Sequence, residues 1–135
     1  MNKQNVIYVL TLVMTLIYLT TSIGVADEPA LCADSVFGSA TAFLASNKLV
    51  VFDCVAYAVH GRIAITDVWL EQKVDGEWEY VKDLTPPSYV SINMPDYGAE
   101  VDYSASITGT GTFRVGFTVD ADGYSISRYS NSRTF

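Results

Sequence analysis

The strongest constraint on the fold is residues 112–120, where apolar and polar side chains alternate without a break. The apolar positions are Phe113, Val115, Phe117 and Val119. A period of two matches a strand with one buried face and cannot place these side chains on one face of a helix. Gly116, on the other face, leaves room for a close neighbour. The chain therefore needs a second layer to cover this strand.

After the N-terminal segment the sequence contains only short alternating runs separated by Gly, Asn, Asp or Pro. This pattern predicts strands rather than helices. We expect strands at residues 39–44, 48–59, 64–74, 77–82, 101–108, 112–120 and 124–133, with a short edge strand at 89–93 in addition. About seven strands in roughly 100 residues are typical of a two-sheet antiparallel β-sandwich of immunoglobulin or fibronectin type III kind. A small closed barrel is the alternative.

Turn residues divide these runs. Asp75-Gly76 suits a type I′ turn and predicts a hairpin that joins residues 67–74 to 77–82. On the first of these strands we expect Val68, Leu70, Gln72 and Val74 to face the core. We expect His60-Gly61 to close a strand and residues 95–98 to turn the chain. Pro86-Pro87 removes two backbone donors and should break pairing.

The N-terminus carries the features of an export signal. Lys3 precedes an apolar run over residues 6–19, and Gly24-Val25-Ala26 offers small residues for cleavage. We therefore expect a signal peptide at 1–26, a tail at 27–38, a β-sandwich domain at 39–135, and a secreted, extracellular protein. The alternative is an uncleaved membrane anchor, because residues 6–23 are long enough to begin spanning a bilayer.

Charge narrows the range of partners. The chain has 8 Lys+Arg against 15 Asp+Glu, a net charge of −7, and no run of basic residues. Loss of residues 1–26 removes Lys3 and makes the charge −8. This composition argues against nucleic acid and anionic membrane surfaces as partners. We expect no cofactor.

Several segments together resemble a known family. They are Asn47-Lys48-Leu49, Trp69 to Lys73 continuing through Asp75-Gly76 to Trp78 and Val81-Lys82, Tyr103 to Ile107, Gly109 to Val115, and Ser127 to Ser132. Over residues 39–133 the chain resembles an uncharacterised family of short exported proteins of clostridial Gram-positive bacteria. The resemblance implies an exported, immunoglobulin-like β-sandwich and brings no activity, ligand or catalytic residue with it. Residues 59–62 and the two cysteines depart from the family pattern.

The two cysteines, Cys32 and Cys54, favour one disulfide in an exported chain. Such a bond would tie the tail to residues 48–59 and restrict the unfolded chain by about 3 kcal/mol. The alternative is that Cys54 is a buried apolar residue and Cys32 is unpaired. The spacing does not suggest a metal or redox site.

Candidate catalytic and metal-binding groups have simpler explanations. His60 is the only imidazole and has no nucleophile motif beside it, so we interpret it as a turn residue. Asp120-Ala121-Asp122-Gly123 has the residue spacing of the first half of a calcium loop but lacks the later bidentate Glu, and a hairpin turn explains the same residues. We expect no catalytic residues, no metal site and no enzymatic activity.

Aromatic side chains offer the best candidate binding surface. Trp69 lies on the polar face of its strand, between Asp67 and Glu71, and Trp78 and Tyr80 follow across the hairpin. We expect Trp78 to enter the core and Trp69 to be the more exposed of the two. The binding residues that we select are Trp69, Glu71, Lys73 and Tyr80.

Three functions from different classes follow. The first is a non-enzymatic binding or interaction module that recognises an extracellular protein or polysaccharide at the cell surface or in the medium. The second is a carbohydrate-binding module that uses exposed aromatic side chains. The third is a small secreted toxin or hydrolase, which would need His60 or an acidic pair.

Overall fold

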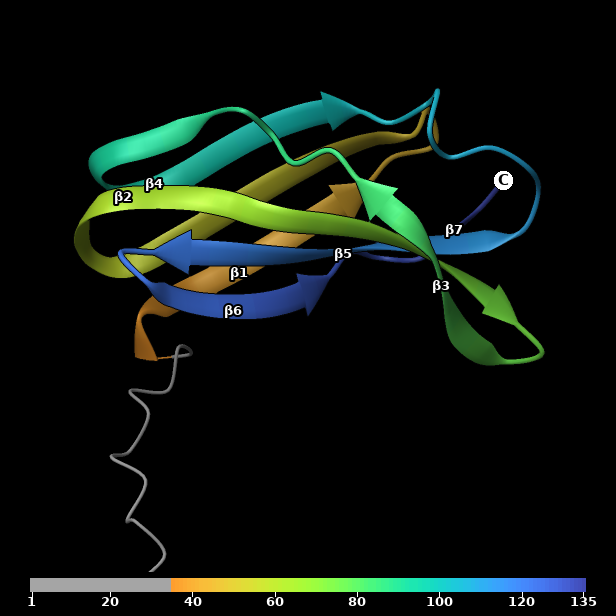
Figure 1. The fold of residues 1–135 in the computed structure, drawn as a ribbon, viewed down its shortest axis with the longest axis horizontal. Coiled ribbons are helices and arrows are strands. Elements are labelled where there is room, and N and C mark those ends of the chain that lie inside the picture. Colours follow the sequence, from red (N-terminus) through yellow and green to blue (C-terminus); the bar gives the residue numbers. More distant parts are fainter. Residues whose placement is uncertain (1–34) are drawn as a thin grey trace, which may run out of the picture. The chain divides into compact units, whose positions relative to one another are not determined.

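A computed structural model describes residues 35–135 and shows an all-β, antiparallel fold of seven strands, as the sequence predicts (Figure 1). The strands are β1 (Phe37–Leu44), β2 (Leu49–Val74), β3 (Glu77–Leu84), β4 (Val90–Asp102), β5 (Thr112–Ala121), β6 (Tyr124–Tyr129) and β7 (Arg133–Thr134). The predicted signal peptide at 1–26, most of the predicted tail and Cys32 lie outside the described residues.

The long strand β2 organises the sheet. It runs without a break for 26 residues and pairs with four other strands. Its first half, residues 49–56, lies between β1 and β4, while its second half, residues 63–74, pairs with β5 on one edge and with β3 on the other. β6 and β7 then extend the sheet from β5.

β2 and β4 bend together at one end of the molecule, so that their halves lie in two layers (Figure 1). The register of their ladder shifts between Val55 and His60, and Pro95 has no partner in that register. The predicted strand ends at His60-Gly61 and at residues 95–98 are therefore wrong. Both segments are bends in continuous strands: residues 53–55 pair with residues 96–98 on one side of the register shift, His60 pairs with Met94 on the other, and Pro95 lies where no donor is needed.

The bend of β2 is held by Asp122, in the turn between β5 and β6. The amides of Gly61 and Arg62 donate hydrogen bonds to the two carboxylate oxygens of Asp122, at 2.8 and 2.9 Å. His60 Nδ1 lies 3.2 Å from Oδ2 of the same carboxylate. The hydrogen bond from the Gly61 amide is the main cause that lowers the pKa of Asp122. A turn 60 residues away thus fixes the bend.

The core lies between the two layers. The alternating side chains of residues 112–120 are buried as expected: Phe113, Val115, Phe117 and Val119. Phe117 meets Phe52, from the first half of β2, edge-on with ring centroids 5.4 Å apart. All seven strands belong to one hydrogen-bonded sheet. The immunoglobulin-like, two-sheet character of the fold stays a prediction.

The remaining differences from the expected strands are local. The Asp75-Gly76 hairpin is confirmed, with φ of 50° and 89° at its two turn residues. Val68 and Leu70 are buried, whereas Val74 is exposed, because the hairpin extends beyond the core (Figure 1).

Two expected strands end early. The strand expected at residues 101–108 stops at Asp102, because the amides of Ser106 and Ile107 donate to the carbonyl of Tyr103 in a turn. The strand expected at residues 124–133 is interrupted between β6 and β7, where the Ser130 hydroxyl accepts the Val115 amide. A side-chain oxygen thus replaces a backbone acceptor of the ladder.

We expect Phe117→Ala to lower the free energy of unfolding by about 3–5 kcal/mol, because it opens a cavity between the layers. Phe43→Ala is the matched control, since Phe43 is 51% exposed on β1 and undergoes the same truncation. Urea unfolding followed by tryptophan fluorescence measures both variants. Equal losses for the two substitutions would contradict the assignment of Phe117 to the core.

Candidate functional site

A cluster of aromatic and charged side chains lies on the outer face of the strands that surround the second half of β2, opposite the core. We name it the Trp–Arg cluster, and its members are Trp69, Glu71, Trp78, Arg114 and Tyr129. They come from β2, β3, β5 and β6. The ladder aligns Glu71 with Arg114, and Trp69 with Gly116 and then Tyr129. Strand register therefore assembles the cluster.

An ion pair lies at the centre of the Trp–Arg cluster. Arg114 Nε donates to Glu71 Oε2 at 2.7 Å, and a terminal guanidinium nitrogen lies 2.6 Å from the same oxygen. The indole N–H of Trp69 donates to Glu71 Oε1 at 3.1 Å. Glu71 is only 9% exposed, and its burial is tolerated because both of its carboxylate oxygens accept hydrogen bonds.

Cations lie over the aromatic rings of the cluster. The guanidinium carbon of Arg114 is 3.8 Å from the ring centroid of Tyr129 and 4.4 Å from that of Trp78. Lys73 Nζ lies 5.7 Å from the Trp78 centroid. These are cation–π contacts, and each one occupies a ring face that a sugar would need for stacking.

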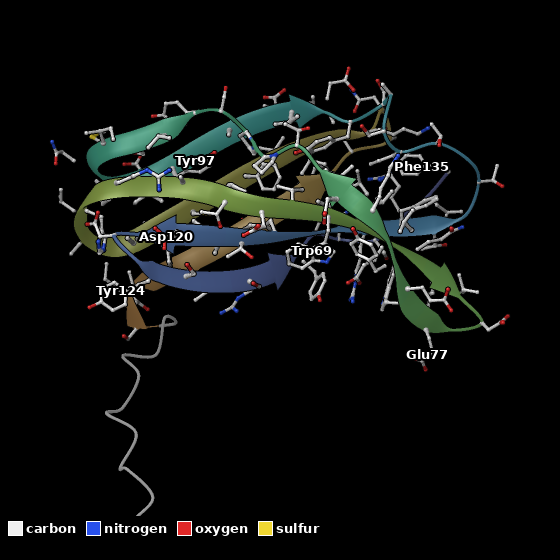
Figure 2. All side chains as sticks on the ribbon, viewed as in Figure 1. Trp69, Glu77, Tyr97, Asp120, Tyr124 and Phe135 are labelled. Atoms are coloured by element: carbon white, nitrogen blue, oxygen red, sulfur yellow. The ribbon has the colours of Figure 1, made fainter. Side chains whose placement is uncertain are left out.

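Gly116 makes room for Trp69. A side chain at position 116 would overlap the indole ring, which lies directly against the glycine. Across this gap Trp69 meets Tyr129 edge-on, with centroids 5.9 Å apart and ring planes at 87°. In Figure 2 Trp69 projects beside the end of β6. The close neighbour expected at Gly116 is thus confirmed, and it is Trp69.

The structure divides the four predicted binding residues into two pairs. Trp69 is half-buried and Glu71 is buried, and both are engaged within the Trp–Arg cluster. Lys73 and Tyr80 are exposed, and Tyr80 is 61% accessible. Tyr80 pairs with Glu71 in the β2–β3 register, so it lies at the edge of the cluster.

The expectation for Trp78 was wrong, and two further residues belong to this face. Trp78 is half-buried on the outer face and is not part of the core, because it pairs with Lys73 in the register and lies under cations. Arg114 and Tyr129 were not predicted as site residues. The alternation of residues 112–120 places Arg114 beside Gly116 on the polar face, but Tyr129 joins them only through the β5–β6 register.

The cluster exposes tyrosines at both of its ends. Tyr80 lies on the β3 side and Tyr129, 46% accessible, on the β6 side. The pKa of Tyr80 is raised, first by desolvation and then by Asp83. The Tyr80 phenol therefore stays neutral at physiological pH, and both tyrosine side chains present amphipathic contact surfaces.

The other candidate residues serve the fold. Asp120 accepts hydrogen bonds from the Gly123 amide at 3.2 Å and from the Ser125 hydroxyl at 2.8 Å. Asp122 and His60 belong to the contact that holds the β2 bend. The hairpin interpretation accounts for the contacts of Asp120, whereas the contacts of Asp122 with β2 are long-range.

Cys54 is fully buried in the core and forms no disulfide within residues 35–135. Its predicted partner Cys32 lies outside the described residues, so the disulfide stays a prediction. Burial is the main cause that raises the pKa of the Cys54 thiol from 9.0 to about 12, with Asp53 adding to it. A thiol in this environment is a poor nucleophile.

Comparison of the chain with protein-family models, curated proteins and solved structures gives no match. Over residues 35–135 the structure holds no helix that is long and apolar enough to cross a membrane. The apolar segment at 6–23 lies outside this range. The interpretation of the site therefore depends on its geometry.

We expect Gly116→Ala to destabilise the protein by about 1–3 kcal/mol, because the added methyl group displaces the Trp69 indole. In a Trp69→Ala background the same substitution should cost much less. A double-mutant cycle by urea unfolding measures this coupling. Additive losses would show that Trp69 does not lie against Gly116.

Alkaline pH should destabilise the protein through Cys54. The unfolded thiol ionises near 9, whereas the folded thiol keeps its proton up to about 12. Stability is therefore complete below pH 9 and falls as pH rises towards 12, by at most about 1.4 kcal/mol per pH unit. Tyr97 and Tyr103, with pKa values raised to about 12 by burial, add to the fall.

Urea unfolding between pH 8 and pH 11, in reductant, compares the wild type with Cys54→Ala. The variant should lose stability with pH less steeply, because it lacks the buried thiol and because the charge of Cys54 no longer helps to raise the pKa of Tyr97. Identical slopes would contradict the burial of a free thiol at this position. Intact mass and alkylation without reductant then report whether Cys32 and Cys54 are bridged.

Proposed function

We propose that this protein is an exported, non-enzymatic binding module that recognises a macromolecular partner at the cell surface or in the medium. The contact surface is the outer face of β3, β2, β5 and β6, with Tyr80 and Tyr129 as its exposed contact residues. The Trp–Arg cluster holds this face in shape. Export is inferred from the N-terminal signal pattern, and membership of the clostridial family stays a prediction.

The observation that carries the proposal is the preorganisation of tryptophan, tyrosine and arginine on one outer face. These residue types dominate the binding energy of protein interfaces. Here Glu71 and Arg114 fix them through short hydrogen bonds, so that little side-chain freedom remains to be lost on binding. Tyr80 is 61% and Tyr129 46% exposed on this face, so both rings are accessible to a partner.

A protein partner suits this face better than a sugar ring. Carbohydrate modules stack sugars on open aromatic faces, whereas Arg114 lies over both Trp78 and Tyr129. Tyr80 alone among the predicted aromatic residues is mostly exposed. The hydrolase alternative has less support, because His60 faces the carboxylate that holds the β2 bend.

The test measures how much fluorescently labelled protein binds when it is added back to the producing cells. The double variant Tyr80→Ser/Tyr129→Ser should bind at least about tenfold more weakly, since it removes two exposed aromatic contacts. Tyr57→Ser is the matched control, because Tyr57 is 73% exposed away from this face. Thermal unfolding confirms that both variants are folded.

The proposal fails if the double variant binds as well as the wild type, or if Tyr57→Ser loses as much binding. Treatment of the cells with protease or with polysaccharide hydrolases identifies the partner class. Loss of binding after protease alone supports a protein partner. Loss after polysaccharide hydrolases alone would favour the carbohydrate-binding alternative.

A further inference from the structure

A groove follows the free edge of β4. It has a volume of about 390 Å³ and lies between β4 and the connection from β3. The connection contributes residues 85–89, and β4 contributes Ala99, Glu100 and Val101. Consecutive residues of a strand face opposite sides of a sheet, so a groove that touches all three runs along the strand's edge.

The backbone of this edge has no strand partner. Within residues 35–135, β4 pairs only with β2. The comparable edge of β1 is closed at its end, because Asn131 accepts the Leu44 amide at 2.8 Å and donates to the Leu44 carbonyl at 3.1 Å. An unpaired edge of this kind is a template for one more strand.

The two sides of the β4 edge differ in chemistry. Asp96, Gly98, Glu100 and Asp102 alternate on the outer side and are exposed, and Asp53 of β2 pairs with Gly98. β4 contains no basic residue. In the described part of the chain, no ion pair within 4.0 Å involves these carboxylates. On the inner side Pro86, Pro87 and Tyr89 line the groove.

A second copy of this chain is a poor occupant of the edge. Antiparallel pairing of two β4 strands would bring their carboxylates close together, and like charges on adjacent strands are destabilising. Each copy also carries a net charge of −7. Acidic side chains on an edge therefore oppose self-association but favour a basic strand.

We propose that the β4 edge binds an extended basic segment of a partner protein by strand addition. The segment pairs its backbone with residues 98–102, since the Asp96 carbonyl already accepts the Ser91 hydroxyl at 2.7 Å. Every second side chain is basic and lies beside Asp96, Glu100 or Asp102, and the intervening side chains are apolar and enter the groove at Pro86, Pro87 and Tyr89. This site is separate from the Trp–Arg cluster.

The experiment titrates the ¹⁵N-labelled protein, in the processed form that the cell produces, with three synthetic peptides. The first alternates lysine and valine over seven residues, the second has the same composition with all lysines first, and the third replaces lysine by glutamate. Chemical shifts should change at residues 98–102 with the first peptide and change little with the other two. Increasing salt should weaken the binding.

Charge-reversal variants locate the site. Glu100→Lys should weaken binding of the alternating peptide by at least roughly tenfold. Glu79→Lys on β3 changes the net charge equally and should weaken it far less. Tyr80→Ser/Tyr129→Ser should leave peptide binding unchanged, so that this test and the cell-binding test fail independently.

Four outcomes would overturn the inference. Equal binding of the block and alternating peptides would mean general attraction to an acidic protein. Equal loss of peptide binding in Glu100→Lys and Glu79→Lys would also mean general attraction to an acidic protein. Chemical-shift changes outside residues 85–102 would mean that the peptide binds at another site. Concentration-dependent self-association through β4 without peptide would mean that a second copy of the chain occupies the edge.

Discussion

The fold depends on one strand that continues through a sharp bend. β2 pairs with β1, β3, β4 and β5, so nearly every strand takes its position from it. The bend keeps its hydrogen bonds because β4 bends with it and because Asp122 accepts the amides of Gly61 and Arg62. The two halves of β2 can then face each other across one core, where Phe52 meets Phe117.

The second half of this sheet carries an outer layer of interactions that links the fold to the proposed function. Glu71 and Arg114 join β2 to β5, and the rings over and under Arg114 extend the contacts to β3 and β6. Four strands are thus held on the face that presents Tyr80 and Tyr129. Rigidity and exposure occur on the same surface, which suits recognition without catalysis.

Sequence patterns predicted the strand faces and turns that depend on neighbouring residues alone. Alternation identified the buried face of β5, and Asp75-Gly76 fixed its hairpin. The sequence was misleading at His60-Gly61 and Pro95, because a distant carboxylate and a partner strand satisfy the backbone there. Alternation placed Trp69, Glu71 and Lys73 on the polar face of their strand, where the register has them, but Arg114 and Tyr129 join them only through long-range register.

Amide hydrogen exchange at the bend of β2 tests the central claim most directly. If β2 is continuous and held by Asp122, the amides of Gly61 and Arg62 should exchange as slowly as those of neighbouring strand residues. Asp122→Ala should accelerate exchange at these two amides first, while the core of β5 remains protected. Rapid exchange of both amides in the wild-type protein, as in an open turn, would contradict the account.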